Sequence, residues 1–365
     1  MEQFVVSARK YRPGTFDSVV GQEKVTSTLL NGISSGQLAQ AFLFCGPRGV
    51  GKTTCARILA KAVNAEDPTK LDSIPDEDLN IFELDAASNN SVEDIRNLID
   101  QVRIAPTAGK KFKVYIIDEV HMLSQAAFNA FLKTLEEPPS YAIFILATTE
   151  KHKILPTIIS RCQVYDFNRI STKDMASHLE KIAKNEGIDY EIEALHTIAV
   201  KADGGLRDAL SIFDQLATFT GKNITYQAAL ENLNVLGEDV YFRMVDHFLK
   251  TDISAALLEL KSIFDKGFDG HLFIVGLSQH FRQLMVAQSE TTLALLETNE
   301  NFEKKYVEQA KAYSKSEIIT ALNVLNEADI QFKNTKNQKL LVELSCMRIA
   351  SLKGLDDEKK KDSLS

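Results

Sequence analysis

Cysteine is scarce in this chain of 365 residues, which has only four, at positions 45, 55, 162 and 346. No two of them stand at C-x-x-C spacing, so the sequence predicts neither a disulfide framework nor a zinc site. Such usage suits a reducing compartment, and we expect four free thiols that pack as small apolar side chains.

Long apolar runs are also missing. No stretch approaches the roughly 18 to 20 residues that a membrane span needs, which excludes an integral membrane protein. Residues Met1 to Arg12 carry three basic side chains and only one short apolar run, unlike a secretory signal. We therefore expect a cytoplasmic protein with no membrane partner.

Positive charge is not in excess either. The net charge is -8, which counts against a protein that coats nucleic acid by itself, because neutralising phosphates needs surplus Lys and Arg. The first 170 residues carry -1 and the rest carry -7. Residues 66–78 hold six acids and one lysine and are expected to form a solvated surface loop. Any nucleic-acid surface should be a local patch on the first part of the chain.

Short apolar runs alternate with helical patterns over residues 1–170. Strand-like runs occupy 41–45, 81–84, 114–117 and 141–146. Helical patterns occupy 53–63, then 91–102 with Ser91 as its N-cap, then a segment capped by Ser124 and ended by Pro138. This alternation predicts an α/β fold with a parallel sheet flanked by helices.

Strand-like runs disappear beyond Ile170, and helical spacing dominates. The sequence predicts several short helices over 171–221, interrupted at Gly187 and at Gly204-Gly205. An all-helical region is expected over 222–353, followed by a frayed, charged tail over 354–365.

One segment matches the phosphate-binding pattern GxxxxGK[ST]. It reads Gly46-Pro47-Arg48-Gly49-Val50-Gly51-Lys52-Thr53 and is followed by Thr54. Its glycines let backbone N–H groups turn toward phosphate oxygens, and the following helix adds the positive end of its dipole. Lys52 would reach the β and γ phosphates, and Thr53 would offer its hydroxyl to Mg²⁺. The segment follows an apolar strand and opens a helix, which is the context that the pattern requires.

A pair of carboxylates follows another buried strand. Asp118 and Glu119 come directly after the run 114–117, at the edge where ligands bind in open α/β sheets. Asp118 would complete the Mg²⁺ shell with Thr53. Glu119 would orient the attacking water or accept its proton.

The sequence around this pair resembles the gamma/tau subunits of the bacterial DNA polymerase III clamp loader, a family of AAA+ ATPases. The most specific run extends from Asp118 to Pro139, DEVHMLSQAAFNAFLKTLEEPP. Further matches are Ala8–Pro13, Val20–Gln22, Leu84–Ser88, Ala147–Thr149, Ser160–Cys162 and Gly205–Leu210. The resemblance implies a P-loop AAA+ ATPase domain over 1–170, a helical lid over 171–221 and an oligomerisation collar over 222–353.

The resemblance also implies roles and partners. Thr149 would be the sensor 1 residue, Arg161 a finger that acts in trans on a neighbour's ATP, and Arg207 the sensor 2 arginine that acts in cis. Arg12 and Val20 would bracket the adenine. With ATP and Mg²⁺ as cofactors, the chain would be a motor that loads the ring-shaped sliding clamp onto primed DNA in chromosome replication. Its partners would be the delta and delta-prime subunits, copies of itself in a pentamer, the beta clamp, primed DNA and the DNA polymerase III core.

Two departures from the family stand out. The family usually places four zinc-binding cysteines where Asn64 to Asn80 here holds none, so we expect no zinc. Tau forms carry a long extension that binds polymerase and helicase, and a chain of 365 residues is expected to correspond to the shorter form or to a shortened tau. The family is classified with DNA-directed DNA polymerases, which are nucleotidyltransferases, but we expect that chemistry in another subunit.

Other interpretations remain at this point. A non-hydrolysing scaffold subunit would have lost Lys52 or the acidic pair, and a different AAA+ motor, such as a branch-migration helicase, would need a pore motif. His121 could be a catalytic base, although a structural hydrogen bond is the simpler reading. Basic side chains that could face DNA or simply be solvated are Arg96, Arg103, Lys110, Lys111 and Lys113.

Overall fold

The chain divides into two compact units, Met1–Ile224 and Thr225–Ser365. The structure, a computed structural model, describes residues 5–65, 67, 71, 78–107, 110–296, 298 and 300–353. Most of the predicted acidic loop over 66–78 and the predicted tail over 354–365 lie outside the described residues. Each unit is described by itself.

Five parallel strands form the sheet of the first unit, in the order β2-β3-β4-β1-β5. They are β1 (Ala41–Cys45), β2 (Ile81–Asp85), β3 (Lys113–Asp118), β4 (Ala142–Thr148) and β5 (Gln163–Asp166). Because all strands run the same way, their carboxyl ends meet at one edge of the sheet. β4 lies between β1 and β3, so the segments that follow these three strands are brought together at that edge.

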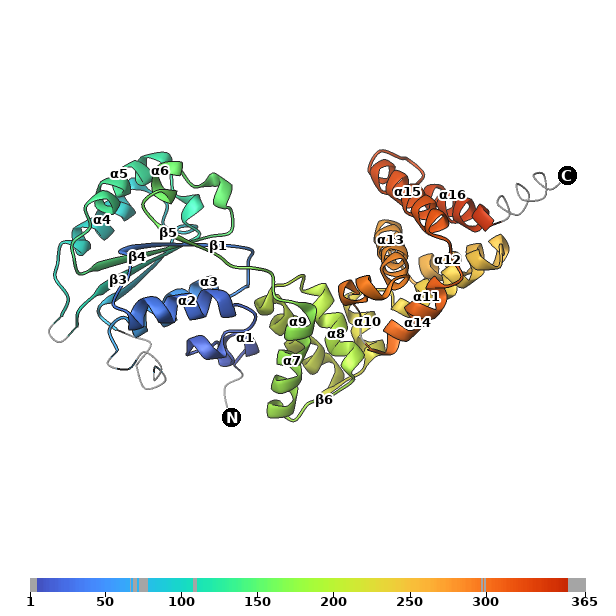
Figure 1. Cartoon of the computed structure of the whole chain (residues 1–365), viewed down its shortest axis with the longest axis horizontal. Coiled ribbons are helices and arrows are strands. Elements are labelled where there is room, and N and C mark those ends of the chain that lie inside the picture. Colours follow the sequence, from blue (N-terminus) through green and yellow to red (C-terminus); the bar gives the residue numbers. More distant parts are fainter. Residues whose placement is uncertain are drawn as a thin grey trace. The chain divides into compact units, whose positions relative to one another are not determined.

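Helices cover both faces of this sheet (Figure 1). One face, with Phe44 and Ile116, packs on α2 (Glu23–Ser34) and α3 (Lys52–Ala62). The other, with Leu43 and Tyr115, packs on α4 (Val92–Val102), α5 (Gln125–Glu136) and α6 (Pro156–Ile159). Since successive strand residues are buried on opposite faces, β1, β3 and β4 read as continuous apolar runs. The structure confirms the predicted parallel α/β fold.

Two predicted helix starts are confirmed. Ser91 Oγ accepts a hydrogen bond from the Asp94 amide at 3.2 Å, and the Asp94 carboxylate accepts the Ser91 amide at 3.1 Å, which completes a capping box. Ser124 Oγ accepts from the Ala127 amide at 3.3 Å at the start of α5. These caps fix the helices that follow β2 and β3.

Three helices complete the first unit. They are α7 (Thr172–Glu186), α8 (Ile192–Lys201) and α9 (Leu206–Thr220), and the short α1 (Ser7–Lys10) contacts α9. Ser7 donates through its amide and hydroxyl to Asp214 of α9, and the Tyr11 hydroxyl donates to Glu186 at 2.5 Å. The N-terminal segment is therefore attached to these helices.

The prediction of no strands beyond Ile170 is wrong in one detail. β6 (Asp189–Tyr190) and β7 (Asn223–Ile224) pair in parallel. Two-residue strands are too short to show an alternating pattern in the sequence. Short 3-10 turns complete the description: η1 (Phe16–Ser18), η2 (Val120–Met122), η3 (Lys151–Lys153) and, in the second unit, η4 (Glu290–Leu295).

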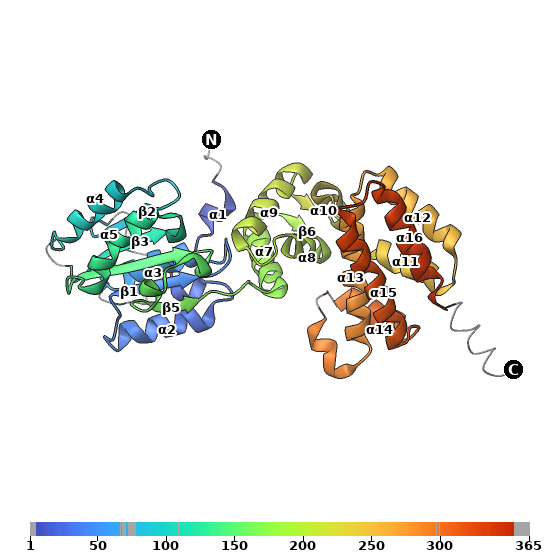
Figure 2. The ribbon, with the colours of Figure 1, turned by 90° about the horizontal axis from the view of Figure 1, so that it is seen from above.

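The second unit is helical throughout its described residues. Its helices are α10 (Tyr226–Leu233), α11 (Glu238–Leu249), α12 (Ile253–Asp265), α13 (Gly270–Ala287), α14 (Glu300–Ala310), α15 (Lys315–Phe332) and α16 (Gln338–Ala350). α13 and α15 lie side by side (Figure 2), and their fully buried Phe281 and Leu325 belong to one core. Nowhere in the described parts of the chain is a helix long and apolar enough to cross a membrane.

Candidate nucleotide-binding site

The phosphate loop joins the end of β1 to the start of α3. Gly46 has φ +151°, and a Cβ there would lie 2.4 Å from the carbonyl oxygen of Phe167. Gly49 has φ +76°, in the left-handed region. Both positions therefore require glycine, for space and for backbone conformation. Pro47, Arg48 and Val50 complete the loop, and α3 begins at Lys52, so N–H groups at the start of a helix face the loop.

Lys52 lies inside this loop. Its side chain is buried, and Nζ donates to the carbonyl oxygens of Gly46 at 2.8 Å and Pro47 at 2.7 Å. Burial lowers the pKa of Lys52, while the carboxylates of Glu119 and Asp118 act in the opposite direction. These two carbonyls use two of the three ammonium donors, and a phosphate oxygen could take the third.

Thr53 and Asp118 meet across the sheet edge. The Thr53 hydroxyl donates to Asp118 Oδ2 at 2.6 Å, and Asp118 Oδ1 accepts the Glu119 amide at 2.9 Å. The pair is close enough to share one metal ion. Within the described residues, no group of three or more His, Cys, Asp and Glu side chains could hold a metal unaided. The hydroxyl of Thr53 and the carboxylate of Asp118 suit Mg²⁺, which proteins often hold with one or two side chains plus phosphate oxygens.

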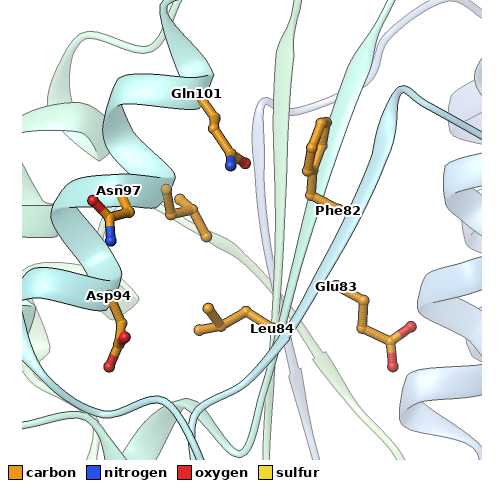
Figure 3. Close-up of a pocket in the computed structure, with 7 residues that line it drawn as sticks. Phe82, Glu83, Leu84, Asp94, Asn97 and Gln101 are labelled. Carbon is orange, nitrogen blue, oxygen red and sulfur yellow. The ribbon is translucent and has the colours of Figure 1, made fainter.

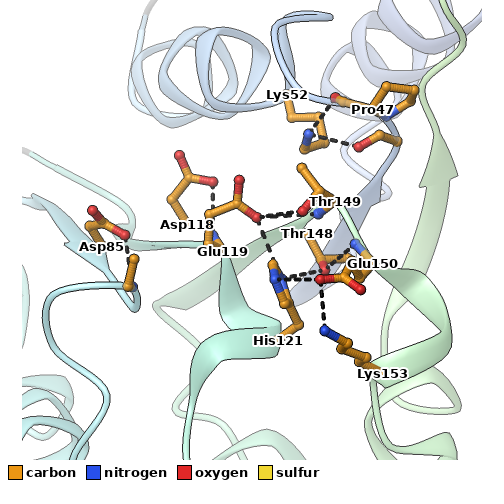
Figure 4. A network of polar contacts seen from close by, with 12 residues as sticks. Pro47, Lys52, Asp85, Asp118, Glu119, His121, Thr148, Thr149, Glu150 and Lys153 are labelled. Atoms are coloured by element: carbon orange, nitrogen blue, oxygen red, sulfur yellow. Dashed lines mark hydrogen bonds and ion pairs between the residues drawn. The ribbon is translucent and has the colours of Figure 1, made fainter. Parts of the chain in front are cut away.

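Glu119 is joined to the end of β4. Its backbone is left-handed, with φ +46°, and its Oε2 accepts hydrogen bonds from Thr149 Oγ1 at 3.0 Å and from the Thr149 amide at 3.3 Å. Figure 4 shows Lys52, at the start of α3, near Asp118 and Glu119 at the end of β3 and Thr149 just after β4. The structure thus brings together the residues predicted from three separate segments.

Arg207 lies on the phosphate loop, where a residue acting in cis should be. Its amide donates to the Gly49 carbonyl at 3.4 Å, and a Cβ at Gly49 would lie 3.4 Å from Arg207 Cβ. The start of α9 therefore packs directly on the loop, while the Arg207 side chain is exposed.

Arg161 lies near the amino ends of the strands, at the opposite end from the phosphate loop. It precedes β5, whose first residue Gln163 pairs with Phe42, three residues before the end of β1. At about 3.3 Å per residue, that level is about 10 Å below the phosphate loop. Arg161 donates instead to Glu136 at 2.7 Å and to the Thr157 carbonyl at 2.6 Å. Its position does not suit action on the ATP of its own subunit.

The segment predicted to bracket the adenine borders the loop. Val19 Cγ1 would lie 3.9 Å from a Cβ at Gly51, the adjoining Val20 is half-buried, and the Arg12 side chain is exposed. Gln22 was not among the predicted site residues, although it lies in the segment Val20–Gln22 that resembles the family. Buried Gln22 donates to the carbonyls of Val50 at 3.3 Å and Asn168 at 2.7 Å, tying the loop to the residues after β5.

One candidate DNA contact is wrong. Lys113 is buried, and Nζ donates to the carbonyls of Gln101 at 3.1 Å and Ile104 at 3.2 Å at the end of α4. Its ammonium therefore donates to carbonyls at the end of a helix from a buried position, and it cannot reach DNA.

A surface hollow of the first unit lies away from this site. One hollow of about 210 Å³ lies between β2 and α4 (Figure 3). It is lined by Phe82, Glu83, Leu84, Asp94, Asn97, Leu98 and Gln101, none of which belongs to the phosphate loop.

The four cysteines are free thiols, as predicted, and three of them are buried.

A parallel sheet with a phosphate loop after β1, an acidic pair after β3 and a polar residue after the intervening β4 defines a P-loop domain of the AAA+ type. Three family models match consecutive parts of the chain. Residues 21–171 match "DNA polymerase III, delta subunit", 174–222 match "DNA polymerase III clamp loader subunit, ATPase lid domain", and 225–363 match "DNA polymerase III subunits gamma and tau domain III".

Two relatives with similar sequences agree with these matches. The chain is 39% identical over 359 residues to DNA polymerase III subunit tau of Bacillus subtilis, covering 93% of this chain and 62% of that protein. It is 33% identical over 359 residues to DNA polymerase III subunit gamma of Buchnera aphidicola subsp. Baizongia pistaciae, covering 95% of this chain and 97% of that protein. Among solved structures, the Thermotoga maritima RuvB Holliday junction branch migration motor aligns with a TM-score of 0.49 and 19% identity, covering 69% of this chain and 85% of that one. The chain belongs to the gamma/tau family of DNA polymerase III subunits.

Proposed function

We propose that this chain is an ATP-hydrolysing motor subunit of a bacterial clamp loader, which loads a ring-shaped sliding clamp onto primed DNA. The observation that carries the proposal is the 2.6 Å contact between the Thr53 hydroxyl and Asp118, beside the phosphate loop that holds Lys52. A hydroxyl and a carboxylate so placed fit a Mg²⁺ ion that also binds phosphate oxygens.

Each residue of the site has a role in this proposal. Backbone N–H groups of the loop and the Lys52 ammonium bind the phosphates, and Thr53 and Asp118 hold the metal. The bound Mg²⁺ would neutralise phosphate charge. Glu119 orients the attacking water or takes its proton. Thr149 and Arg207 contact the phosphates from β4 and from the lid, and Arg12 and Val20 lie beside the adenine.

Arg161 completes the site of a neighbouring subunit. A finger supplied in trans stabilises charge only after subunits assemble, which makes hydrolysis depend on assembly. The proposed partners are the delta and delta-prime subunits, further copies of this chain, the beta clamp, primed DNA and the DNA polymerase III core. The collar over 222–353 would join the subunits. Nucleotidyl transfer is assigned to another subunit, because the residues gathered here serve phosphate binding and water activation.

Steady-state ATPase assays test the proposal. We expect turnover by the assembled loader to rise when clamp and primed DNA are added together. A rate that stays flat would contradict the loading function. Binding of labelled ATP to the isolated chain separates the motor from a non-hydrolysing scaffold, which would leave the nucleotide unbound.

The count of subunits tests the remaining alternative. A mass measurement that gives a pentamer with delta and delta-prime supports the clamp loader. A hexamer of this chain alone would favour a different AAA+ motor.

A further inference from the structure

His121 lies between two carboxylates next to the candidate site. It belongs to η2, directly after the acidic pair, and its side chain is only 7% exposed. Nδ1 lies 3.4 Å from Glu119 Oε2, and Nε2 lies 3.3 Å from Glu150 Oε1 (Figure 4). The imidazole therefore lies between the two carboxylates, and in its neutral form it can donate a hydrogen bond to one of them.

We propose that His121 is a positioning residue for ATP hydrolysis, which keeps the Glu119 carboxylate in place for the attacking water. The proposal rests on the function proposed above. In its terms, Glu119 acts on the water and His121 acts through Glu119.

The groups that donate hydrogen bonds to the Glu119 carboxylate explain why it needs His121 as a second support. Glu119 Oε2 accepts the Thr149 hydroxyl at 3.0 Å, and a hydroxyl group has a single proton to donate. If Thr149 turns that proton to a phosphate oxygen, as its sensor role requires, Glu119 loses its shortest side-chain contact. His121 then holds the same oxygen, together with the Thr149 amide at 3.3 Å.

The backbone of Glu119 makes this support more important. The residue has φ +46°, which costs a non-glycine residue about 1 kcal/mol or more and persists only where neighbouring groups hold it.

His121 is itself held from the β4 side. Thr148 Oγ1 lies 3.1 Å from His121 Nδ1 and accepts the Glu150 amide at 3.0 Å. The Glu150 carboxylate accepts Lys153 Nζ at 2.8 Å. The imidazole is thus fixed by the last residue of β4 and by residues that follow it, and its position is independent of the phosphate loop.

Single-turnover and steady-state kinetics of His121→Ala in the assembled loader test the proposal. We expect kcat to fall about tenfold or more, since small displacements of a catalytic group are costly. KM for ATP, and the affinity for a non-hydrolysable ATP analogue, should change less than about twofold, because His121 does not touch the phosphate loop. His121→Asn can still place a donor near Nδ1, and it should recover much of the rate.

A matched control is His152→Ala. His152 Nε2 lies 3.6 Å from Glu150 Oε2, but the His152 side chain is exposed. Among the described residues, it contacts neither Glu119 nor Thr148. We expect its kinetics to equal those of the unchanged protein. A crystal structure of His121→Ala should show Glu119 in a new rotamer.

The outcomes separate the two proposals. If the unchanged protein binds and hydrolyses ATP but His121→Ala has the same kcat, the positioning role is wrong. A fall in analogue affinity or melting temperature that matches the loss of rate, without recovery in His121→Asn, would also overturn it. If the unchanged loader hydrolyses no ATP, the proposed function itself fails.

Discussion

The guanidinium of Arg161 donates to Glu136, at the end of α5, at 2.7 Å. This ion pair holds the arginine near the amino ends of the strands. Lys52 lies in the phosphate loop, at their carboxyl ends. This placement supports the proposal that Arg161 serves a site on another subunit.

Mixing experiments test this separation. Lys52→Ala should abolish nucleotide binding in its own subunit, because the loop loses its buried charge. Arg161→Ala should bind nucleotide nearly as well as the unchanged protein while turnover in the neighbouring site falls by about 10³-fold. Fluorescent-nucleotide titration and ATPase rates of mixed assemblies measure the two effects. Equal loss of binding in both variants would show that Arg161 acts in cis.

Removing the Thr53 hydroxyl should separate metal binding from phosphate binding. In Thr53→Val the contact with Asp118 is lost, so the affinity for the Mg²⁺ complex of ATP should decrease about tenfold or more. ATP without the metal should bind almost unchanged, and Thr53→Ser should restore the metal effect. Isothermal titration with and without Mg²⁺ makes the measurement. An equal loss under both conditions would contradict the shared metal site.

Gly49→Ala should disturb the contact between the phosphate loop and α9. Alanine at φ +76° costs about 1–2 kcal/mol, and its Cβ would lie 3.4 Å from Arg207 Cβ. We expect a lower melting temperature and weaker nucleotide binding. Gly36→Ala is the control, because Gly36 has φ +69° but nothing within 4 Å of a Cβ. It should lose stability and keep nucleotide affinity. Nucleotide affinity that falls equally in both variants would count against a role of the α9 contact.

Lys113→Met should destabilise the first unit by about 2 kcal/mol, because two carbonyls at the end of α4 lose a charged donor. DNA affinity should stay the same. Exposed Lys111 offers the comparison: Lys111→Met should leave the melting temperature unchanged. If Lys113→Met kept full stability but bound DNA more weakly, Lys113 would contact DNA after all.

The stability of the second unit should depend on His280. Burial lowers its pKa to about 4 from 6.5, and its hydrogen bond with Gln309 acts in the opposite direction. The unfolded chain gains a proton near pH 6.5 and the folded chain only near pH 4. Stability is therefore lost as the pH falls through that window, by on the order of 3 kcal/mol. Burial also raises the pKa of Glu238 to about 7 from 4.5, so stability decreases as the pH rises between these values.

Comparing variants isolates the histidine, because the Glu238 contribution is the same in both proteins. The free energy of unfolding should be measured by urea denaturation of the unchanged chain and of His280→Gln between pH 4 and pH 8. The difference between the two proteins should shift in favour of the variant as the pH falls. A difference that is constant across this range would show that His280 is not the titrating group.

Much of the site followed from local sequence. The run Gly46–Thr53 specifies its own backbone, and a β-branched run before Asp118 specifies a strand end, so both were predictable. The family resemblance placed Thr149 among the predicted site residues as sensor 1. Its contact with Glu119 was not predicted, and it arises because β4 lies between β1 and β3.

The remaining features depend on tertiary contacts. Lys113 looked like a solvated charge because nothing in the sequence records that its stem is buried under α4. Gln22 was missed because its partners, Val50 and Asn168, come from distant segments. His121 carries no motif that reveals a second carboxylate at residue 150. Such pairings become visible only when strand order is known.

If copies of this chain assemble as proposed, the all-parallel direction of the strands affects how they meet. It places the phosphate loop on one rim of the first unit and Arg161 on the other. Contacts between copies that use both rims are head-to-tail, and a head-to-tail row that does not close leaves its two end members unlike the rest. One end would present an arginine with no nucleotide to reach, and the other a nucleotide that no arginine reaches. In an open arc of such subunits, the two end subunits would therefore differ from the others in function, even if every chain had the same sequence.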